Sequence, residues 1–205
     1  MASPSSNPLT DTLAATGFPR RHRLAICEKR LRGHPEAKVA QGACEEVLRR
    51  RGGMLALLGP RGTGKTQLSA VLAYNCLAWA KQGASEDPDI LKAWKDPHYI
   101  RLADLLSGAK QAFGTDRDPL GDASQWGLLI LDEIGESRQS DYDQKELVRL
   151  IDRRYGALLP TIVIGNMKPE MLVATLGESS VSRLQETGMI VQCNWPSWRN
   201  MEVKR

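Results

Sequence analysis

The chain has 205 residues, of which 41% are hydrophobic and 25% charged, a composition typical of a globular protein with one sizeable core. Its net charge of +4 is modest, no apolar run reaches the length of a membrane span, and residues 1–16 do not form a secretory signal. Four scattered cysteines without a C-x-x-C pair indicate thiols in a reducing cytoplasm.

The segment before Pro35 is predicted to lie outside the core. Residues 1–16 are rich in Ser, Pro, Thr and Asn, which favours a loose tail over the alternative of a short partner-binding helix at 9–15. A short basic helix is predicted over 20–32. We therefore expect residues 1–34 to be a flexible tail and a basic segment that is a candidate for partner docking, and residues 35–205 to form the core domain.

Positive charge is concentrated between residues 19 and 51. Ten lysine and arginine residues stand there against four glutamates, which gives this stretch a net charge of +6. A basic stripe of this kind favours binding to the phosphates of a nucleic acid. A helix face that is merely solvated explains the same charges, and both interpretations stay open.

Apolar periodicity from Pro35 onward predicts alternating helices and strands. Helices are expected over 36–51, 67–80, 103–113, from 140 or 141 to 156, 169–176 and 179–186, and strands over 54–58, 98–102, 126–131, 161–164 and 189–193. Residues 81–96 and 114–124 are predicted to be loops, the first with one helical turn. The periodicity counts Val39 and Phe113 among the inward-facing residues. Such alternation indicates an α/β fold with a five-stranded parallel sheet and helices on both faces.

A segment between the first strand and the next helix matches the phosphate-binding P-loop, G-x-x-x-x-G-K-[ST]. Glycines let successive N–H groups converge on a phosphate, and the helix start adds free donors. Lys65 can reach the β- and γ-phosphates, and Thr66 can place its hydroxyl on Mg²⁺. A glycine-rich turn that only joins two elements is the alternative. The candidate nucleotide-binding residues are Gly59, Pro60, Arg61, Gly62, Thr63, Gly64, Lys65, Thr66 and Gln67.

Two acids follow the apolar strand at 126–131. Asp132 is expected to hold hydrated Mg²⁺ beside Thr66, and Glu133 is expected to act as the general base for an attacking water. Because parallel strands end at the same edge of a sheet, the acids and the P-loop are predicted to meet there. An acidic turn that caps the following helix is the alternative.

Asn166 follows the fourth predicted strand. A polar side chain at that edge can reach a γ-phosphate or the attacking water, and the same residue type is common in turns. The chemistry of the residue alone does not choose between the two.

Together these residues resemble an AAA+ ATPase of the group that holds DnaC-type replicative helicase loaders and IstB-type transposition ATPases. The resemblance covers about residues 39–199. Residues 59–66 match Walker A, 128–133 match Walker B, 164–166 are similar to the sensor I strand end, 182–184 resemble an arginine-finger stretch, and 194–199 resemble the terminal N-W-x-S-[YW]-R of the group.

The resemblance implies a sheet order of 5-1-4-3-2, ATP and Mg²⁺ as cofactors, and little or no lid domain, since few residues follow the fifth strand. It also implies that Asn166 and Arg199 act as sensors, and that Arg183 acts in trans on a neighbour's nucleotide as a catalytic residue beside Lys65 and Glu133. The alternative for Arg183 is an ion pair with Glu178 or Glu186 on its own helix. Trp195 and Trp198 are expected to cover the sheet edge.

The function implied is that of a cytoplasmic, ATP-dependent helicase loader, which hydrolyses ATP at subunit interfaces of a head-to-tail oligomer on single-stranded DNA. Its partner would be a hexameric replicative DNA helicase. DnaC-type loaders carry an N-terminal helicase-binding domain, for which residues 1–34 are too short, so the basic segment would have to dock the helicase. The alternatives are a transposition ATPase that acts with a transposase on duplex DNA, a P-loop small-molecule kinase, and an adaptor that binds nucleotide without useful hydrolysis.

Overall fold

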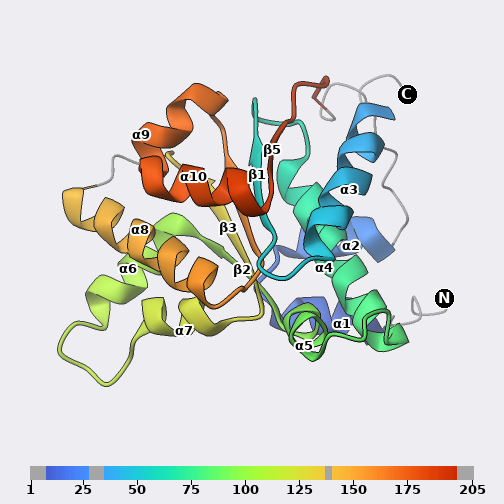
Figure 1. Ribbon diagram of the computed structural model, residues 1–205, viewed down its shortest axis with the longest axis horizontal. Coiled ribbons are helices and arrows are strands. Elements are labelled where there is room, and N and C mark those ends of the chain that lie inside the picture. The colour runs from blue at the N-terminus through green and yellow to red at the C-terminus, as the bar shows by residue number, and fades with distance from the viewer. Residues whose placement is uncertain (1–7, 28–34, 137–139, 198–205) are drawn as a thin grey trace.

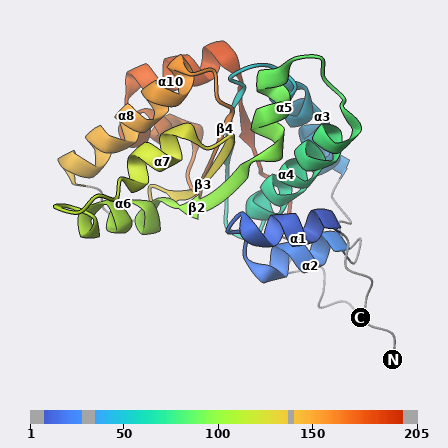
Figure 2. The ribbon, with the colours of Figure 1, turned by 90° about the horizontal axis from the view of Figure 1, so that it is seen from below.

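A parallel sheet with helices on both faces forms the centre of the molecule (Figures 1 and 2). The computed structural model describes residues 8–27, 35–136 and 140–197. Within these residues there are five strands: β1 (Met54–Leu58), β2 (Pro97–Arg101), β3 (Leu128–Ile134), β4 (Thr161–Gly165) and β5 (Met189–Gln192). Their order, β2-β3-β4-β1-β5, confirms the expected 5-1-4-3-2 arrangement, and every pairing is parallel.

Two helical layers cover the two faces of the sheet (Figure 2). The layer on one side contains α1 (Pro8–Ala15), α2 (Arg20–Cys27), α3 (Pro35–Leu48), α4 (Lys65–Gln82) and α5 (Pro88–Lys95). The layer on the other side contains α6 (Leu102–Gln111), α7 (Pro119–Gln125), α8 (Asp141–Gly156), the 3₁₀ helix η1 (Pro169–Met171), α9 (Leu172–Leu176) and α10 (Glu178–Thr187). Among the described residues, no helix combines the length and apolar character needed to cross a membrane.

The central strands are apolar throughout because both of their faces are covered. Alternate side chains of a strand point to opposite faces. Leu55 and Leu57 of β1 accordingly join the core under α4, while Met54, Ala56 and Leu58 join the core under α8. This explains why the sequence of β1 is a continuous apolar run.

The loose tail expected over residues 1–16 is wrong from Pro8 onward. Residues Pro8–Ala15 form α1, and the side chains of Leu13 and Phe18 are buried in the core beside α4. Composition alone missed this helix because it does not show which apolar side chains of so short a segment are buried. The basic helix is present as α2 up to Cys27, residues 28–34 lie outside the described part, and the division of the chain at residue 35 stays a prediction.

The turn after α1 fixes the N-terminal segment to the sheet. The backbone N–H of Tyr99 in β2 donates to the carbonyl of Thr16 at 2.7 Å. Gly17 has a φ of 87°, and a Cβ at this position would lie 2.4 Å from the carbonyl oxygen of Tyr99. Only glycine fits so close to the strand, and the turn after α1 is therefore packed against β2.

Other differences from the sequence predictions have local causes. Residues 119–125 form α7 rather than loop, with the Asp118 side chain accepting from the Gly121 N–H at 2.9 Å as an N-cap. Val39 is 75% exposed because burial in α3 begins only at Cys44. Phe113 is 93% exposed because α6 has already ended at Gln111.

Arg154 of α8 anchors the edge of the sheet opposite the candidate site. Its side chain is fully buried, and burial lowers its pKa to about 9. Burying a charge without hydrogen-bond partners is costly, so the hydrogen bonds of the guanidinium are needed to offset its burial. It donates to the carbonyl oxygens of Ala123, Trp126, Gly127 and Pro160 and to the hydroxyl of Thr161. These contacts tie α7 and α8 to the starts of β3 and β4.

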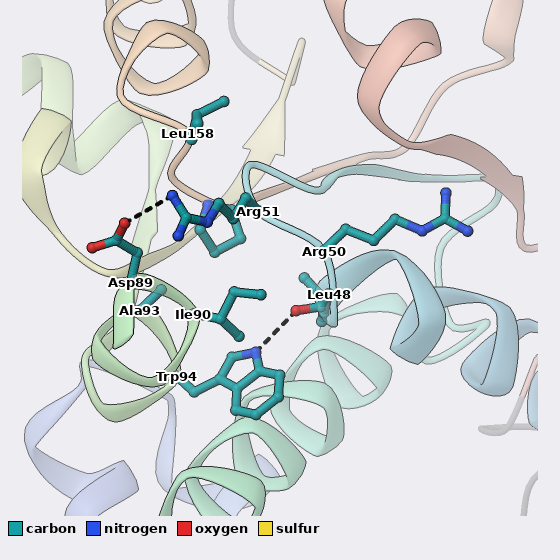
Figure 3. A pocket seen from close by; sticks show the side chains of 9 residues that line it. Leu48, Arg50, Arg51, Asp89, Ile90, Ala93, Trp94 and Leu158 are labelled. Atoms are coloured by element: carbon teal, nitrogen blue, oxygen red, sulfur yellow. Dashed lines mark hydrogen bonds and ion pairs between the residues drawn. The ribbon is translucent and has the colours of Figure 1, made fainter. Parts of the chain in front are cut away.

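A small pocket between α3 and α5 is a structural joint (Figure 3). Its volume is about 10 Å³, which is space for no more than one water molecule. The Trp94 indole donates to the carbonyl of Leu48 at 2.9 Å, and Arg51 pairs with Asp89 at 3.0 Å across the pocket. These contacts hold α3 and α5 together, and the pocket between them is too small for a ligand.

Candidate active site

The phosphate-binding loop lies between β1 and α4, as the motif predicts. Gly59, Gly62 and Gly64 all have positive φ values, of 143°, 88° and 85°. A Cβ on Gly59 would lie 2.5 Å from the carbonyl oxygen of Cys193, so the loop can only approach the end of β5 with glycine here. This tight curvature leaves the loop amides free to converge on an anion at the start of α4.

Lys65 lies at the centre of the loop, in the first turn of α4. Its ammonium group donates to the carbonyl oxygens of Gly59 at 2.8 Å and Pro60 at 2.7 Å. The side chain is buried, and this burial lowers its pKa. Phosphate oxygens are stronger acceptors for an ammonium than neutral carbonyls, so the group is well placed to move to a phosphate.

The two predicted metal-binding residues are in contact. The Thr66 hydroxyl donates to Oδ2 of Asp132 at 2.8 Å, and Asp132 is buried at the end of β3. A hydroxyl and a carboxylate are the oxygen donors that suit Mg²⁺, which keeps several waters when bound to proteins. The residues present therefore fit the cation that the resemblance implies.

Tyr99 is a member of the site that the sequence analysis missed. Its hydroxyl donates to the same Oδ2 of Asp132, also at 2.8 Å. Burial and the negative charge of Asp132 raise the pKa of this phenol, so it stays protonated as a donor. No motif marks Tyr99, but the expected sheet order places β2 beside β3, and a polar side chain on β2 could have been found on that ground.

Glu133 points out of the sheet at an irregular place in β3. Its φ is 61°, rare for a residue with a side chain, and the pairing of β3 with β4 shifts between Leu131 and Ile134. The Glu133 side chain is exposed to the clefts around the loop. Burial, then the charges of Asp132 and Glu136, raise its pKa, in the direction that strengthens a base.

Asn166 and Arg61 of the phosphate loop both contact the carboxylate of Glu136. The Asn166 amide donates to Glu136, and Arg61 of the loop pairs with the other oxygen of Glu136 at 2.8 Å. The structure thus brings Asn166 to the same edge as the loop, as predicted. Glu136 was not foreseen, because it follows the Walker B acids without a motif of its own.

Two adjoining clefts surround these side chains. The larger has a volume of about 750 Å³ and the smaller about 420 Å³, and both are bordered by Thr66, Asp132 and Glu133. A volume of this size is typical of small-molecule sites. Arg21 and His22 of α2 border both clefts, which was not expected of the N-terminal segment.

Gln67 and Trp195 contact neighbouring elements around the loop. Gln67 pairs with His22 through two contacts, of 2.8 Å and 3.2 Å. The Trp195 indole is buried and donates to the carbonyl of Thr63 at 2.6 Å. Trp195 therefore braces the phosphate loop in addition to covering the sheet edge, while Trp198 and Arg199 lie outside the described residues.

Arg183 lies on α10 and does not border either cleft of its own chain. Its guanidinium donates to Asp152 of α8 and to Ser179, and it lies 5.3 Å from the ring centre of Tyr155. The alternative of a pair with Glu178 or Glu186 is wrong, since the carboxylate it contacts belongs to another helix.

Part of the basic stripe has structural partners. Arg49 stacks on Trp79, with 4.0 Å between the guanidinium carbon and the ring centre, and Arg51 pairs with Asp87 and Asp89. Arg20, Arg21, Lys38 and Arg50 are exposed. The surface available to phosphates is therefore smaller than the net charge suggests.

Comparison with known proteins places these features in a family. A family model described as IstB-like ATP binding protein matches residues 9–201. The replicative helicase loader DnaC of Escherichia coli K12 is 30% identical over 147 residues, 69% of this chain and 54% of that protein. The uncharacterized protein YdaV of the same organism is 27% identical over 148 residues, 70% of this chain and 54% of its own. The chain spans about half the length of these curated relatives.

Solved structures agree on the fold. The crystal structure of the DnaC helicase loader superposes with a TM-score of 0.57 at 20% identity, covering 91% of this chain and 99% of that chain. The replication initiator DnaA bound to AMPPCP and single-stranded DNA gives a TM-score of 0.63 at 19% identity, covering 86% and 50%. At this level of identity the likeness concerns the fold, which is that of the P-loop AAA+ proteins.

Proposed function

The chain belongs to the family of IstB-like ATP-binding proteins, and on that premise we propose that it is an ATP-dependent loader of a replicative DNA helicase. The observation that carries the proposal is the joined Thr66–Asp132 pair beside a complete phosphate loop, in a chain whose curated relatives include the helicase loader DnaC. The loader would act in the cytoplasm on single-stranded DNA.

Each site residue has a role in hydrolysing ATP to ADP and phosphate. The loop amides and Lys65 would bind the phosphates, and Thr66 and Asp132 would hold Mg²⁺. Bound there, Mg²⁺ would neutralise charge on the β- and γ-phosphates. Glu133 would take the proton from a water that attacks the γ-phosphorus, as the bond to the ADP oxygen breaks. Asn166 would have to leave Glu136 to orient that water.

Arg183 would complete the site of a neighbouring subunit. Its side chain borders neither of the two clefts around the phosphate loop of its own chain, which fits a role in trans, and its contact with Asp152 would be exchanged for a neighbour's phosphate on assembly. We therefore propose a head-to-tail oligomer in which hydrolysis takes place at the interfaces.

Replacing Arg183 by alanine is expected to leave nucleotide binding intact and to lower hydrolysis by about 10³ or more, as for other arginines supplied in trans. Mixing Arg183→Ala with Lys65→Ala chains should restore part of the activity, because some interfaces then pair an intact loop with an intact arginine. ATPase assays of each variant and of the mixture test this. Arg149→Ala is the control, because Arg149 is also an ion-paired arginine but lies on α8, where it pairs with Glu146. A mixture no more active than its components would contradict a role in trans.

The exposed basic residues on α2 and α3 are proposed to contact DNA phosphates. Counterion release would make this binding weaken steeply as salt rises. The residues on α2 are also candidates for docking the helicase, since α2 belongs to the basic N-terminal segment.

A second candidate is favoured by the family description itself. The matching family model is described as IstB-like, and the sequence resembles IstB-type transposition ATPases, so a transposase on duplex DNA is the second candidate partner. A small-molecule kinase is the alternative of another class, and turnover of a metabolite without DNA would favour it. The complete set of Lys65, Thr66, Asp132 and Glu133 argues against an adaptor without hydrolysis. Capture of the partner from the host cell decides between helicase and transposase.

A further inference from the structure

The N-terminal helix pair, α1 and α2, packs against α4 (Figure 2), and His22 of α2 borders the cleft that contains Thr66 and Asp132. We propose that Tyr99 and His22 are positioning residues for the two metal-binding side chains, and that through them the N-terminal helix pair sets the affinity for Mg-nucleotide. This inference rests on the proposed function, because it assigns a control element to the same site.

The first connection runs through Tyr99 to Asp132. The rings of Phe18 and Tyr99 pack with centroids 4.8 Å apart, and the Tyr99 backbone is bonded to Thr16 at 2.7 Å. The Tyr99 hydroxyl in turn holds Oδ2 of Asp132 at 2.8 Å. The turn after α1 therefore fixes the strand and ring that orient the carboxylate.

The second connection runs through His22 to the residue beside Thr66. Arg21 Nε donates to Nε2 of His22 at 3.1 Å, so the imidazole proton lies on Nδ1, which donates to Oε1 of Gln67 at 2.8 Å. The Gln67 amide nitrogen donates a hydrogen bond to the His22 carbonyl oxygen at 3.2 Å. Burial lowers the pKa of His22, which agrees with a neutral ring. This paired contact fixes the first turn of α4, which carries the Thr66 hydroxyl.

The two connections converge, because Thr66 and Tyr99 donate to the same oxygen of Asp132. A carboxylate that is held in place before binding does not have to be ordered when the cation arrives. The site therefore binds the cation with higher affinity. A partner that binds or displaces the N-terminal helix pair would therefore change the affinity of the chain for Mg-nucleotide. By thermodynamic linkage, Mg-nucleotide would change the affinity for that partner by the same factor.

The test uses the full chain and the ATP analogue AMPPCP, which avoids any dependence on turnover. Nucleotide affinity is measured against free Mg²⁺ and again in EDTA, for wild type, Tyr99→Phe and His22→Leu. We expect Tyr99→Phe to need about tenfold more Mg²⁺ for half-maximal binding, the size of one hydrogen bond to a charged group, while its affinity in EDTA stays unchanged. His22→Leu should shift the Mg²⁺ requirement in the same direction.

Tyr142→Phe and Leu24→Ala are the controls, since they alter an exposed tyrosine of α8 and an exposed leucine of α2. Hydrogen exchange supplies a second readout. Mg-AMPPCP should slow exchange in α1 and α2 of the wild type, and the Tyr99→Phe, His22→Leu double variant should lose that protection.

Three results would overturn the inference. If wild type binds Mg-AMPPCP and both variants keep its Mg²⁺ requirement, the inference fails and the proposed function stands. If the variants lose affinity equally with and without Mg²⁺, the two residues are only structural. If wild type binds no Mg-nucleotide at all, the proposed function fails together with this inference.

Discussion

Lys65→Ala is expected to abolish nucleotide binding, with a loss of affinity of at least ~100-fold. The ammonium of Lys65 now donates to two loop carbonyls, and each charge-assisted bond that it would transfer to phosphate is worth about tenfold or more. Isothermal titration with Mg-ATP measures the loss.

The fold should survive the Lys65→Ala change. The ammonium donates to two neutral carbonyls and has no ion pair among the described residues, so removing it leaves no charge without a partner. A thermal melt without nucleotide should therefore resemble that of the wild type. Lys81→Ala, at an exposed position in the last turn of the same helix, is the matched control. Tight ATP binding by Lys65→Ala would defeat the assignment of the phosphate loop.

Glu133→Gln is expected to bind ATP normally and to lower hydrolysis by 10²–10⁴, roughly the contribution of a positioned general base. The amide keeps the shape of the side chain and cannot take a proton from water. Glu133 is exposed at the cleft, so its loss should not disturb the packing of β3.

Single-turnover assays with radiolabelled ATP separate the two effects, because the variant should retain ATP that the wild type converts to ADP. Glu170→Gln, the same change at an exposed residue of η1, is the control. Turnover by Glu133→Gln at the wild-type rate would remove Glu133 as the base.

The parts of this site that could be predicted are those encoded in short stretches of sequence. The glycine spacing of the loop and the apolar runs of the strands are local signals, and the sheet order came from the family resemblance. The contact between Thr66 and Asp132 then follows, because the loop after β1 leads to Thr66 and β3 ends near Asp132 at the same edge of the sheet.

Long-range contacts that no motif marks could not be predicted. Tyr99 meets Asp132 only because β2 packs beside β3, and His22 meets Gln67 only because α2 folds back on α4. Arg183 of α10 pairs with Asp152 of α8 rather than with an acidic residue of α10. Tertiary packing decides such pairs, and periodicity carries no information about them.

One local signal was left unused by the sequence prediction. Asp118 followed by Pro119 fits a helix start, and α7 begins there within the predicted loop at 114–124. In α1, the side chain of Leu13 is fully buried, and composition cannot distinguish such a side chain from an exposed one. The N-terminal segment was therefore expected to be loose, although it borders the site.

The central claim is that this ATPase fold serves a replicative helicase, and affinity capture from the host cell tests it most directly. The tagged chain is used as bait with Mg-ATP, with Lys65→Ala as a parallel bait, and the recovered proteins are identified by mass spectrometry. The account predicts that the hexameric replicative helicase is recovered with the wild-type chain. Recovery of a transposase in place of the helicase would contradict it.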